Sequence, residues 1–239
     1  MKVKAHNLLG IFFTLLLVAG IMFGSGLMDD HGYPITYHDV LENGTAETGA
    51  ENLVTAIYLD FRIFDTLFEA LLLLVSVMGI KQFSGLSMRE RSGPGKKDVS
   101  VDTRHLSSLP SNGLALLYPV IAVVGLYIII GGADGPGGGF QGGAMLSAIY
   151  ISIHFSTGRQ LTSSHRLETI EKYSYVFILA VVSIFLMFHT GLDVRLHRLY
   201  LAVMNVLIGV KVFSGLSVIY YLFANESLEG GLGYEVERN

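Results

Sequence analysis

The 239-residue sequence has no cysteine and no tryptophan, and only 15% of its residues are charged. Without cysteine, the chain cannot form disulfides or hold zinc, iron–sulfur clusters or haem through thiolates. A soluble domain carries about 25% charged residues, so a soluble protein is not expected. The mild net charge of −4 argues against a nucleic-acid partner. The chain is therefore not expected to carry electrons or to bind nucleic acid.

The sequence has long runs of apolar residues and few charged ones. The sequence is 51% hydrophobic, with a mean hydropathy of +0.53. A membrane-spanning segment must be a helix of roughly 20 apolar residues or part of a closed barrel, because hydrocarbon offers no hydrogen-bond partners. The runs lack strand-like alternation, so they predict an all-α integral membrane protein with about six transmembrane helices. We expect these helices over residues 8–28, 52–80, 113–131, 141–155, 173–190 and 200–223.

The distribution of cationic residues predicts the topology. If the N-terminus is cytoplasmic, 12 of the 16 Lys and Arg residues fall in cytoplasmic segments. Arg195 and Arg198 then lie outside, and Arg62 and Lys211 lie within helices. The positive-inside rule therefore places both termini in the cytoplasm of a multi-pass protein of the cell membrane. The first apolar run is longer than a signal-peptide core and no A-x-A site follows it, so we interpret it as a retained helix.

A polar stretch between the second and third expected helices predicts a domain boundary. It contains the turn-forming run Ser92-Gly93-Pro94-Gly95 and several Lys and Arg residues. We therefore divide the chain into a two-helix segment (1–88), a cytoplasmic linker (89–112) and a four-helix domain (113–239).

Charged residues inside the second expected helix are the first candidates for function. Arg62, Asp65 and Glu69 are three and four residues apart, so they share one helix face. A charge at a helix centre costs roughly 2.5–3.5 kcal/mol to insert, so this face requires a protein interior or a water-filled cavity. We interpret Arg62–Asp65 mainly as a structural ion pair. Glu69 has no cation within its own turn, which makes it a candidate for an ion or proton path. Asp60 is expected to be a solvated residue near the helix end.

Lys211 is a second costly charge, deep in the last expected helix. It either pairs with a carboxylate of another subunit or acts as a proton relay, because a buried lysine changes its protonation state readily. The residues around the preceding turn are interpreted as interfacial anchors: His189, Asp193, His197 and Tyr200. Neither a nucleophile–base pair nor a recognised metal-ligand spacing occurs, so no catalytic centre is expected.

The stretch 131–143 holds eight glycines in thirteen residues. It lacks the G-K-[S/T] element of a phosphate-binding loop. Glycine permits close helix approach and positive φ angles, which favours a re-entrant or tightly packed helical hairpin. The alternative is that the exposed backbone of this stretch lines an ion vestibule.

Two stretches resemble a known protein family. The run Pro136-Gly137-Gly138-Gly139-Phe140-Gln141-Gly142-Gly143, together with residues 205–212, resembles the MrpB (MnhB) subunit of multisubunit Na⁺/H⁺ antiporters over about residues 105–225. The run from Asp60 to Glu69 resembles the C-terminal end of the large MrpA subunit over about residues 5–88. That piece also occurs as a small subunit of group 4 membrane-bound hydrogenases and related complexes.

The resemblance implies a fusion of two subunits that contributes to the path of Na⁺ and H⁺, the transported ions, without a cofactor of its own. Partners would be other Mrp-type membrane subunits, within the lipid bilayer. In a ferredoxin-linked, hydrogenase-type parent there would also be a peripheral arm, and iron–sulfur, flavin or Ni–Fe centres would lie on partner subunits. The candidate path residues are Glu69, Asp65, Lys211 and Arg62. A free antiporter and a redox-driven parent both stay open. The alternative function is a purely structural scaffold with static buried ion pairs.

Overall fold

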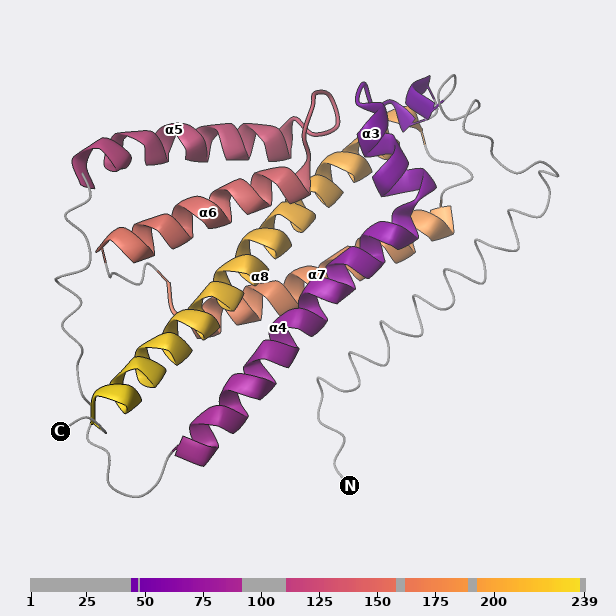
Figure 1. Cartoon of the computed structure of the whole chain (residues 1–239). Coiled ribbons are helices and arrows are strands. Elements are labelled where there is room, and N and C mark those ends of the chain that lie inside the picture. The colour runs from indigo at the N-terminus through magenta and orange to yellow at the C-terminus, as the bar shows by residue number, and fades with distance from the viewer. Residues whose placement is uncertain (1–43, 47, 92–110, 158–161, 189–192, 237–239) are drawn as a thin grey trace, which may run out of the picture.

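The computed structural model of this chain describes residues 44–46, 48–91, 111–157, 162–188 and 193–236 (Figure 1). Within these ranges every regular element is a helix, which confirms the predicted all-α class. The first expected helix (8–28) and residues 92–110 of the expected linker lie outside the described residues. The other five expected segments coincide with helices. The elements are α3 (Leu53–Ala56), the π-helix η1 (Ile57–Phe61), α4 (Ile63–Arg91), α5 (Ser111–Ile130), α6 (Gly139–Thr157), α7 (Ser164–Phe188) and α8 (Val194–Val236).

Three of the described helices are long and apolar enough to cross a membrane. They comprise Ile63–Phe83 of α4, all of α7, and Val194–Ala224 of α8. A helix of about 20 residues reaches about 30 Å, the thickness of the hydrocarbon core. Helix α5 adds a shorter apolar stretch, Leu116–Ile130. The chain is thus a membrane protein, and the cytoplasmic location of its termini stays a prediction.

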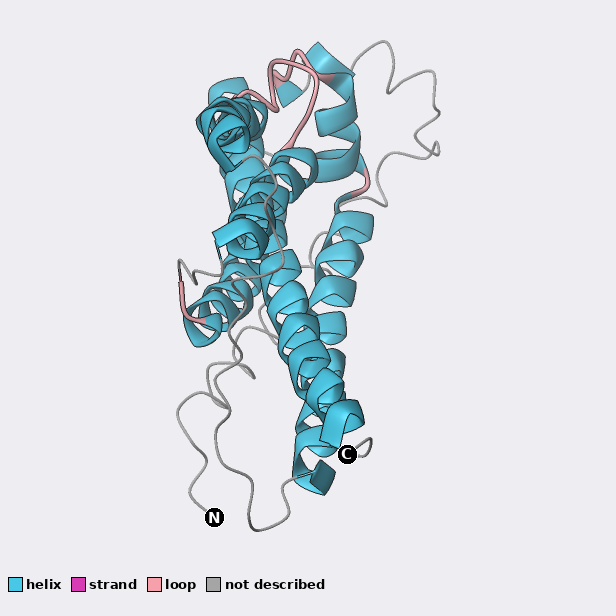
Figure 2. Cartoon of the chain, turned by 60° about the vertical axis from the view of Figure 1, so that its left-hand side comes forward, coloured by secondary structure: helices cyan, strands magenta, loops and turns pink. Residues whose placement is uncertain are grey.

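Helix α8 is the centre of the bundle. It contacts α4, α5, α6 and α7, and Figure 1 shows it running between α6 and α4. The bundle is elongated along its helices (Figure 2), and the loop between α5 and α6 lies at the same end as α3 (Figure 1). Every described membrane-spanning helix therefore packs on α8, so residues of α8 are the ones placed to connect the others.

The second expected helix is interrupted, which the apolar pattern did not predict. In η1 the Arg62 amide donates to the carbonyl of Ile57, five residues back, and Arg62 itself leaves helical geometry (φ −123°, ψ 34°) before α4 begins. A π-turn of this kind removes carbonyls from the regular α-helical ladder. The Thr66 hydroxyl donates to the carbonyl of Tyr58, and the Tyr200 hydroxyl donates to that of Leu59 (2.9 Å). Side-chain hydroxyl groups thus supply hydrogen bonds to two backbone carbonyls at the break. Such partners are needed inside a membrane, where no water is present to supply them.

Helices α7 and α8 both begin earlier than expected, at Ser164 and Val194 rather than at residues 173 and 200. The first turns of α7 are polar, so a search for long apolar runs did not include them in the expected helix. Their helix is supported by an i,i+4 ion pair in which Lys172 Nζ lies 2.7 Å from Glu168 Oε1. The early start of α7 brings Glu168, Glu171 and Lys172 into a helix that packs on α8 and α4.

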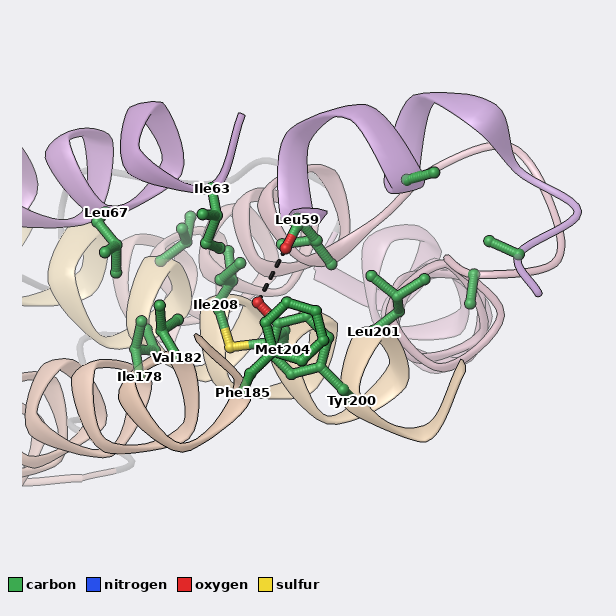
Figure 3. Packing of buried hydrophobic residues seen from close by; sticks show 14 residues of the cluster. Leu59, Ile63, Leu67, Ile178, Val182, Phe185, Tyr200, Leu201, Met204 and Ile208 are labelled. Carbon is green, nitrogen blue, oxygen red and sulfur yellow. Dashed lines mark hydrogen bonds between the residues drawn. The ribbon is translucent and has the colours of Figure 1, made fainter. Parts of the chain in front are cut away.

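The main hydrophobic core joins the two expected domains (Figure 3). It combines residues from the break and α4, from α7, and from α8. The buried members that Figure 3 labels are Leu59, Ile63, Leu67, Ile178, Val182, Phe185, Tyr200, Leu201, Met204 and Ile208. Within it the rings of Phe185 and Tyr200 stack with centroids 3.7 Å apart. Residues on both sides of the linker therefore share one core, while the division at residues 89–112 itself stays a prediction.

Candidate ion-path site

The charged face of α4 points away from the other helices that the structure describes. The side chains of Arg62 and Asp65 form an ion pair, but they are 70% and 52% exposed. Glu69 is also exposed and lies further along the same helix, beside the exposed apolar side chains of Phe68 and Leu72. The Arg62–Asp65 pair expected from the sequence is present, but no described helix covers it, so its place in a protein interior or a water-filled cavity stays a prediction.

Lys211 is buried between α7 and α8, and its partner belongs to the same chain. Its Nζ lies 2.5 Å from Oε1 of Glu171, and the two side chains are 1% and 0% exposed. The expectation that a static pair would need a carboxylate from another subunit is therefore wrong. The Lys211 ammonium group also lies over the Tyr175 ring, with the ring centroid 5.1 Å from Nζ.

Sequence reasoning missed Glu171, although a signal was available. Glu171 and Lys211 are each 20 residues from position 191, which is between α7 and α8 in the sequence. Residues placed in this way lie at the same depth in a helical hairpin. The glutamate was overlooked because it falls in the polar stretch that was read as a loop before α7.

Asp60 and His197 are brought together at the helix break. Asp60 Oδ2 lies 3.1 Å from His197 Nε2, and each side chain is only 9% exposed. The expectation of a solvated Asp60 is wrong, because the π-turn carries this residue inward against the start of α8. His197, which was read as an interfacial anchor, is instead packed against the Phe185 ring, with centroids 5.0 Å apart.

Asn205 on α8 fixes the glycine-rich loop to the broken helix. Its Oδ1 accepts hydrogen bonds from the Tyr58 hydroxyl and from the Gly139 amide (2.9 Å) at the start of α6. On the other side of the loop, the Asn52 side-chain amide donates to the carbonyls of Gly132 (2.9 Å) and Gly135 (2.7 Å). These loop carbonyls are thus engaged by protein groups, which agrees with the packed-hairpin interpretation of the loop.

The glycines of the motif 136–143 have separate packing roles. Gly137 has φ +129°, which residues with a side chain rarely adopt. Gly142 faces α5, where a Cβ would lie 2.6 Å from the Gly125 carbonyl oxygen. Gly143 faces α8, where a Cβ would lie 2.6 Å from the Gly209 carbonyl oxygen. Adjacent glycines therefore let α6 approach two different helices.

One face of α6 carries small residues every fourth position and packs on α8. Gly139 and Gly143 are followed by Ser147, whose hydroxyl lies 3.3 Å from that of Ser217. Small residues at this spacing allow membrane helices to pack closely enough for van der Waals contact to hold them together. The motif thus has a structural account that does not require an ion at the loop.

The candidate path residues fall into two groups. Arg62, Asp65 and Glu69 lie on the outside of α4, and the ion pairs recorded for the described residues join Lys211 to Glu171 and to none of these three. Among the described residues, no cluster of three His, Asp or Glu side chains is placed to hold a metal ion. Any path through both groups would therefore need more than the described part of this chain.

Comparison with known proteins identifies the second half of the chain. Residues 110–219 match the family model of a domain related to the MnhB subunit of Na⁺/H⁺ antiporters. The Methanocaldococcus jannaschii protein named uncharacterized protein MJ1307 is 26% identical over 206 residues, covering 74% of this chain and 78% of that protein.

Two solved structures align with most of this chain. One is a chain of the membrane-bound sulfane sulfur reductase, an archaeal respiratory membrane complex, with a TM-score of 0.62 and 25% identity over 91% of this chain and 97% of that one. The other belongs to the Mrp complex of Dietzia sp. DQ12-45-1b, with a TM-score of 0.48 and 20% identity over 91% of this chain and 26% of that one. The resemblance of the second half to MnhB is confirmed: this all-α membrane protein carries, over residues 110–219, a domain related to the MnhB subunit of Na⁺/H⁺ antiporters.

Proposed function

We propose that this chain is a non-catalytic subunit of a Na⁺/H⁺ antiporter module in the cell membrane, and that the charged face of α4 lines its cation path. The observation that carries the proposal is the exposure of Asp65 and Glu69 on α4, a helix long enough to span the membrane, and of Arg62 directly before it. At roughly 2.5–3.5 kcal/mol for each charge, this face is costly to place against lipid. A neighbouring membrane subunit with polar groups or a water-filled cavity must then cover it.

The MnhB-related domain supports the antiporter module as the setting of this face. Helix α4 packs on α7 and α8, so the domain holds the charged face in a fixed orientation toward its neighbour. Glu69 lies about 9 Å along the axis from Ile63, the first residue of α4, which is about a third of the way across the bilayer. A carboxylate at that depth is placed to bind a passing Na⁺ or proton once partner subunits enclose it.

We further propose that the parent complex is redox-driven. The support is the likeness in fold to nearly the whole length of a chain of an archaeal respiratory membrane complex, because that likeness extends over both halves of this protein. In such a parent, a peripheral arm would supply the iron–sulfur and other redox centres, and this chain would supply none.

The test is purification of the native complex through a tag on this chain. Subunits with redox centres together with antiporter-type subunits are expected to co-purify, and the reconstituted complex should exchange Na⁺ for protons. Antiporter-type subunits alone would contradict the redox-driven parent. A complex that moves neither ion would contradict the antiporter function and favour a purely structural scaffold.

A further inference from the structure

We infer that Glu171 and Lys211 form a proton-loading site inside this chain, which is filled from the surface through Glu168. The inference rests on the proposed function and adds a proton store that is separate from the α4 face. Glu171 comes from α7 and Lys211 from α8, and both side chains are enclosed by the chain itself. Burial of two charges is costly, so the arrangement needs a reason beyond packing.

The hydrogen bonding of the pair is uneven. Glu171 Oε1 receives the hydrogen bond from Lys211, whereas Oε2 has no accessible surface and no hydrogen-bond partner among the described residues. Buried polar atoms are nearly always partnered, so each exception calls for an explanation. A proton bound to Oε2 would form an O–H group there and give this buried oxygen the bonding partner that it lacks.

A route from the surface reaches the pair along α7. Glu168 lies three residues before Glu171, on the same face of the helix, where side chains are about 5–6 Å apart at Cβ. Glu168 is 14% exposed and accepts from two surface lysines, with Lys81 Nζ at 2.6 Å and Lys172 Nζ at 2.7 Å. The titratable groups recorded around the buried pair are thus Glu168 on its own helix and Tyr175, whose ring faces Lys211.

The proton balance of the site is simple. A hydronium ion at the surface gives a proton to the Glu168 carboxylate and becomes water. Glu168 then passes the proton to Oε2 of Glu171, directly or through a water molecule, and becomes a carboxylate again. The carboxylate of Glu171 becomes a carboxylic acid, and the site then carries the single positive charge of the Lys211 ammonium group. Unloading reverses these steps, so one proton is bound and one is released in each cycle.

The double variant E171Q/K211M tests this assignment in the whole complex. It removes both protonatable groups and leaves no unpaired buried charge, so the subunit should assemble as in the wild type. Na⁺-driven proton movement in proteoliposomes should fall at least tenfold, and E168Q should lower it severalfold. D134N is the control. It removes the exposed ion pair between Asp134 and Arg198, which is not part of the proposed proton site, and it should leave transport unchanged.

Infrared difference spectroscopy of the complex gives a readout that is independent of transport. Acidification should produce a C=O stretching band of a protonated carboxyl group that is missing in E171Q/K211M. Normal transport, an unchanged band, or loss of the subunit in the double variant would overturn the proton site. If the wild-type complex exchanges Na⁺ for protons and the double variant does so too, only the proton site is wrong. If the wild type exchanges neither ion, the antiporter function fails, while the band still decides whether Glu171 binds a proton.

Discussion

The Tyr200 hydroxyl of α8 donates a 2.9 Å hydrogen bond to the carbonyl of Leu59, which lies in the π-helical break before α4. The bond connects the first half of the chain to the MnhB-related domain. Because the carbonyl is released from regular α-helical bonding and is buried in the main core, a partner from another helix must satisfy it.

Tyr200→Phe should therefore destabilise the protein without disturbing the packing of the ring. The Phe185 stack is retained, and the unpartnered Leu59 carbonyl costs about 1–3 kcal/mol. The thermal unfolding midpoint of the purified complex should fall. Tyr173→Phe is the control, since Tyr173 is 57% exposed and should tolerate the change. An unaltered midpoint for Tyr200→Phe would show that the bond does not stabilise the break.

Gly143→Ala should weaken the contact between α6 and α8. The added Cβ would lie 2.6 Å from the Gly209 carbonyl oxygen, and overpacking of this kind costs about 1–3 kcal/mol. The amount of subunit in the membrane should fall, as measured by quantitative blotting. Gly79→Ala is the matched control, because a Cβ at that helical glycine meets nothing within 4 Å. Equal amounts of the two variants would argue against the packing role of the motif.

The sequence indicated more of the fold than of the side-chain partnerships. Apolar runs predicted every described membrane helix, because the bilayer demands long apolar segments. They did not predict the break at Arg62, because a π-turn depends on hydrogen bonds from distant residues such as Tyr200. Asp60 was placed wrongly for the same reason.

The candidate site divides in a similar way. The cost of inserting a charge into a membrane singled out Lys211 in the sequence. Its partner Glu171 lies in the polar opening turns of α7, which hydropathy assigns to a loop. The glycine content of residues 131–143 predicted close packing. Which helix each glycine faces is set by the assembled bundle, as Gly142 and Gly143 illustrate.

The topology can be tested with single cysteines, because the natural chain has none. Cysteines at Ser92 and Ser107, in the expected linker, should resist thiol reagents that do not cross the membrane, whereas a cysteine at the exposed Ala46 should react. The reason is the bias of loop cations toward one side of the membrane. Labelling of the linker positions from outside intact cells would reverse the assigned orientation.

A chain divided near Gly95 should still assemble when both pieces are expressed together. Helix α4 packs on α7 and α8 through the shared core, so the covalent linker is not needed to hold it there. Co-purification of the two pieces through a tag on one of them is the measurement. Pieces that accumulate separately in the membrane would show that the shared core is too weak to join them.

Glu69 gives the most direct test of the proposed path. Glu69→Gln keeps the size of the side chain and removes its charge, and Glu51→Gln serves as the control at an exposed acid outside the membrane-spanning part of α4. The measurement is Na⁺-dependent proton transport by the reconstituted complex, with the amount of subunit determined in the same vesicles. We expect fully assembled complex whose transport is reduced at least severalfold by Glu69→Gln alone. Normal transport by this variant, or a loss of transport that only follows loss of the subunit, would contradict the cation path along α4.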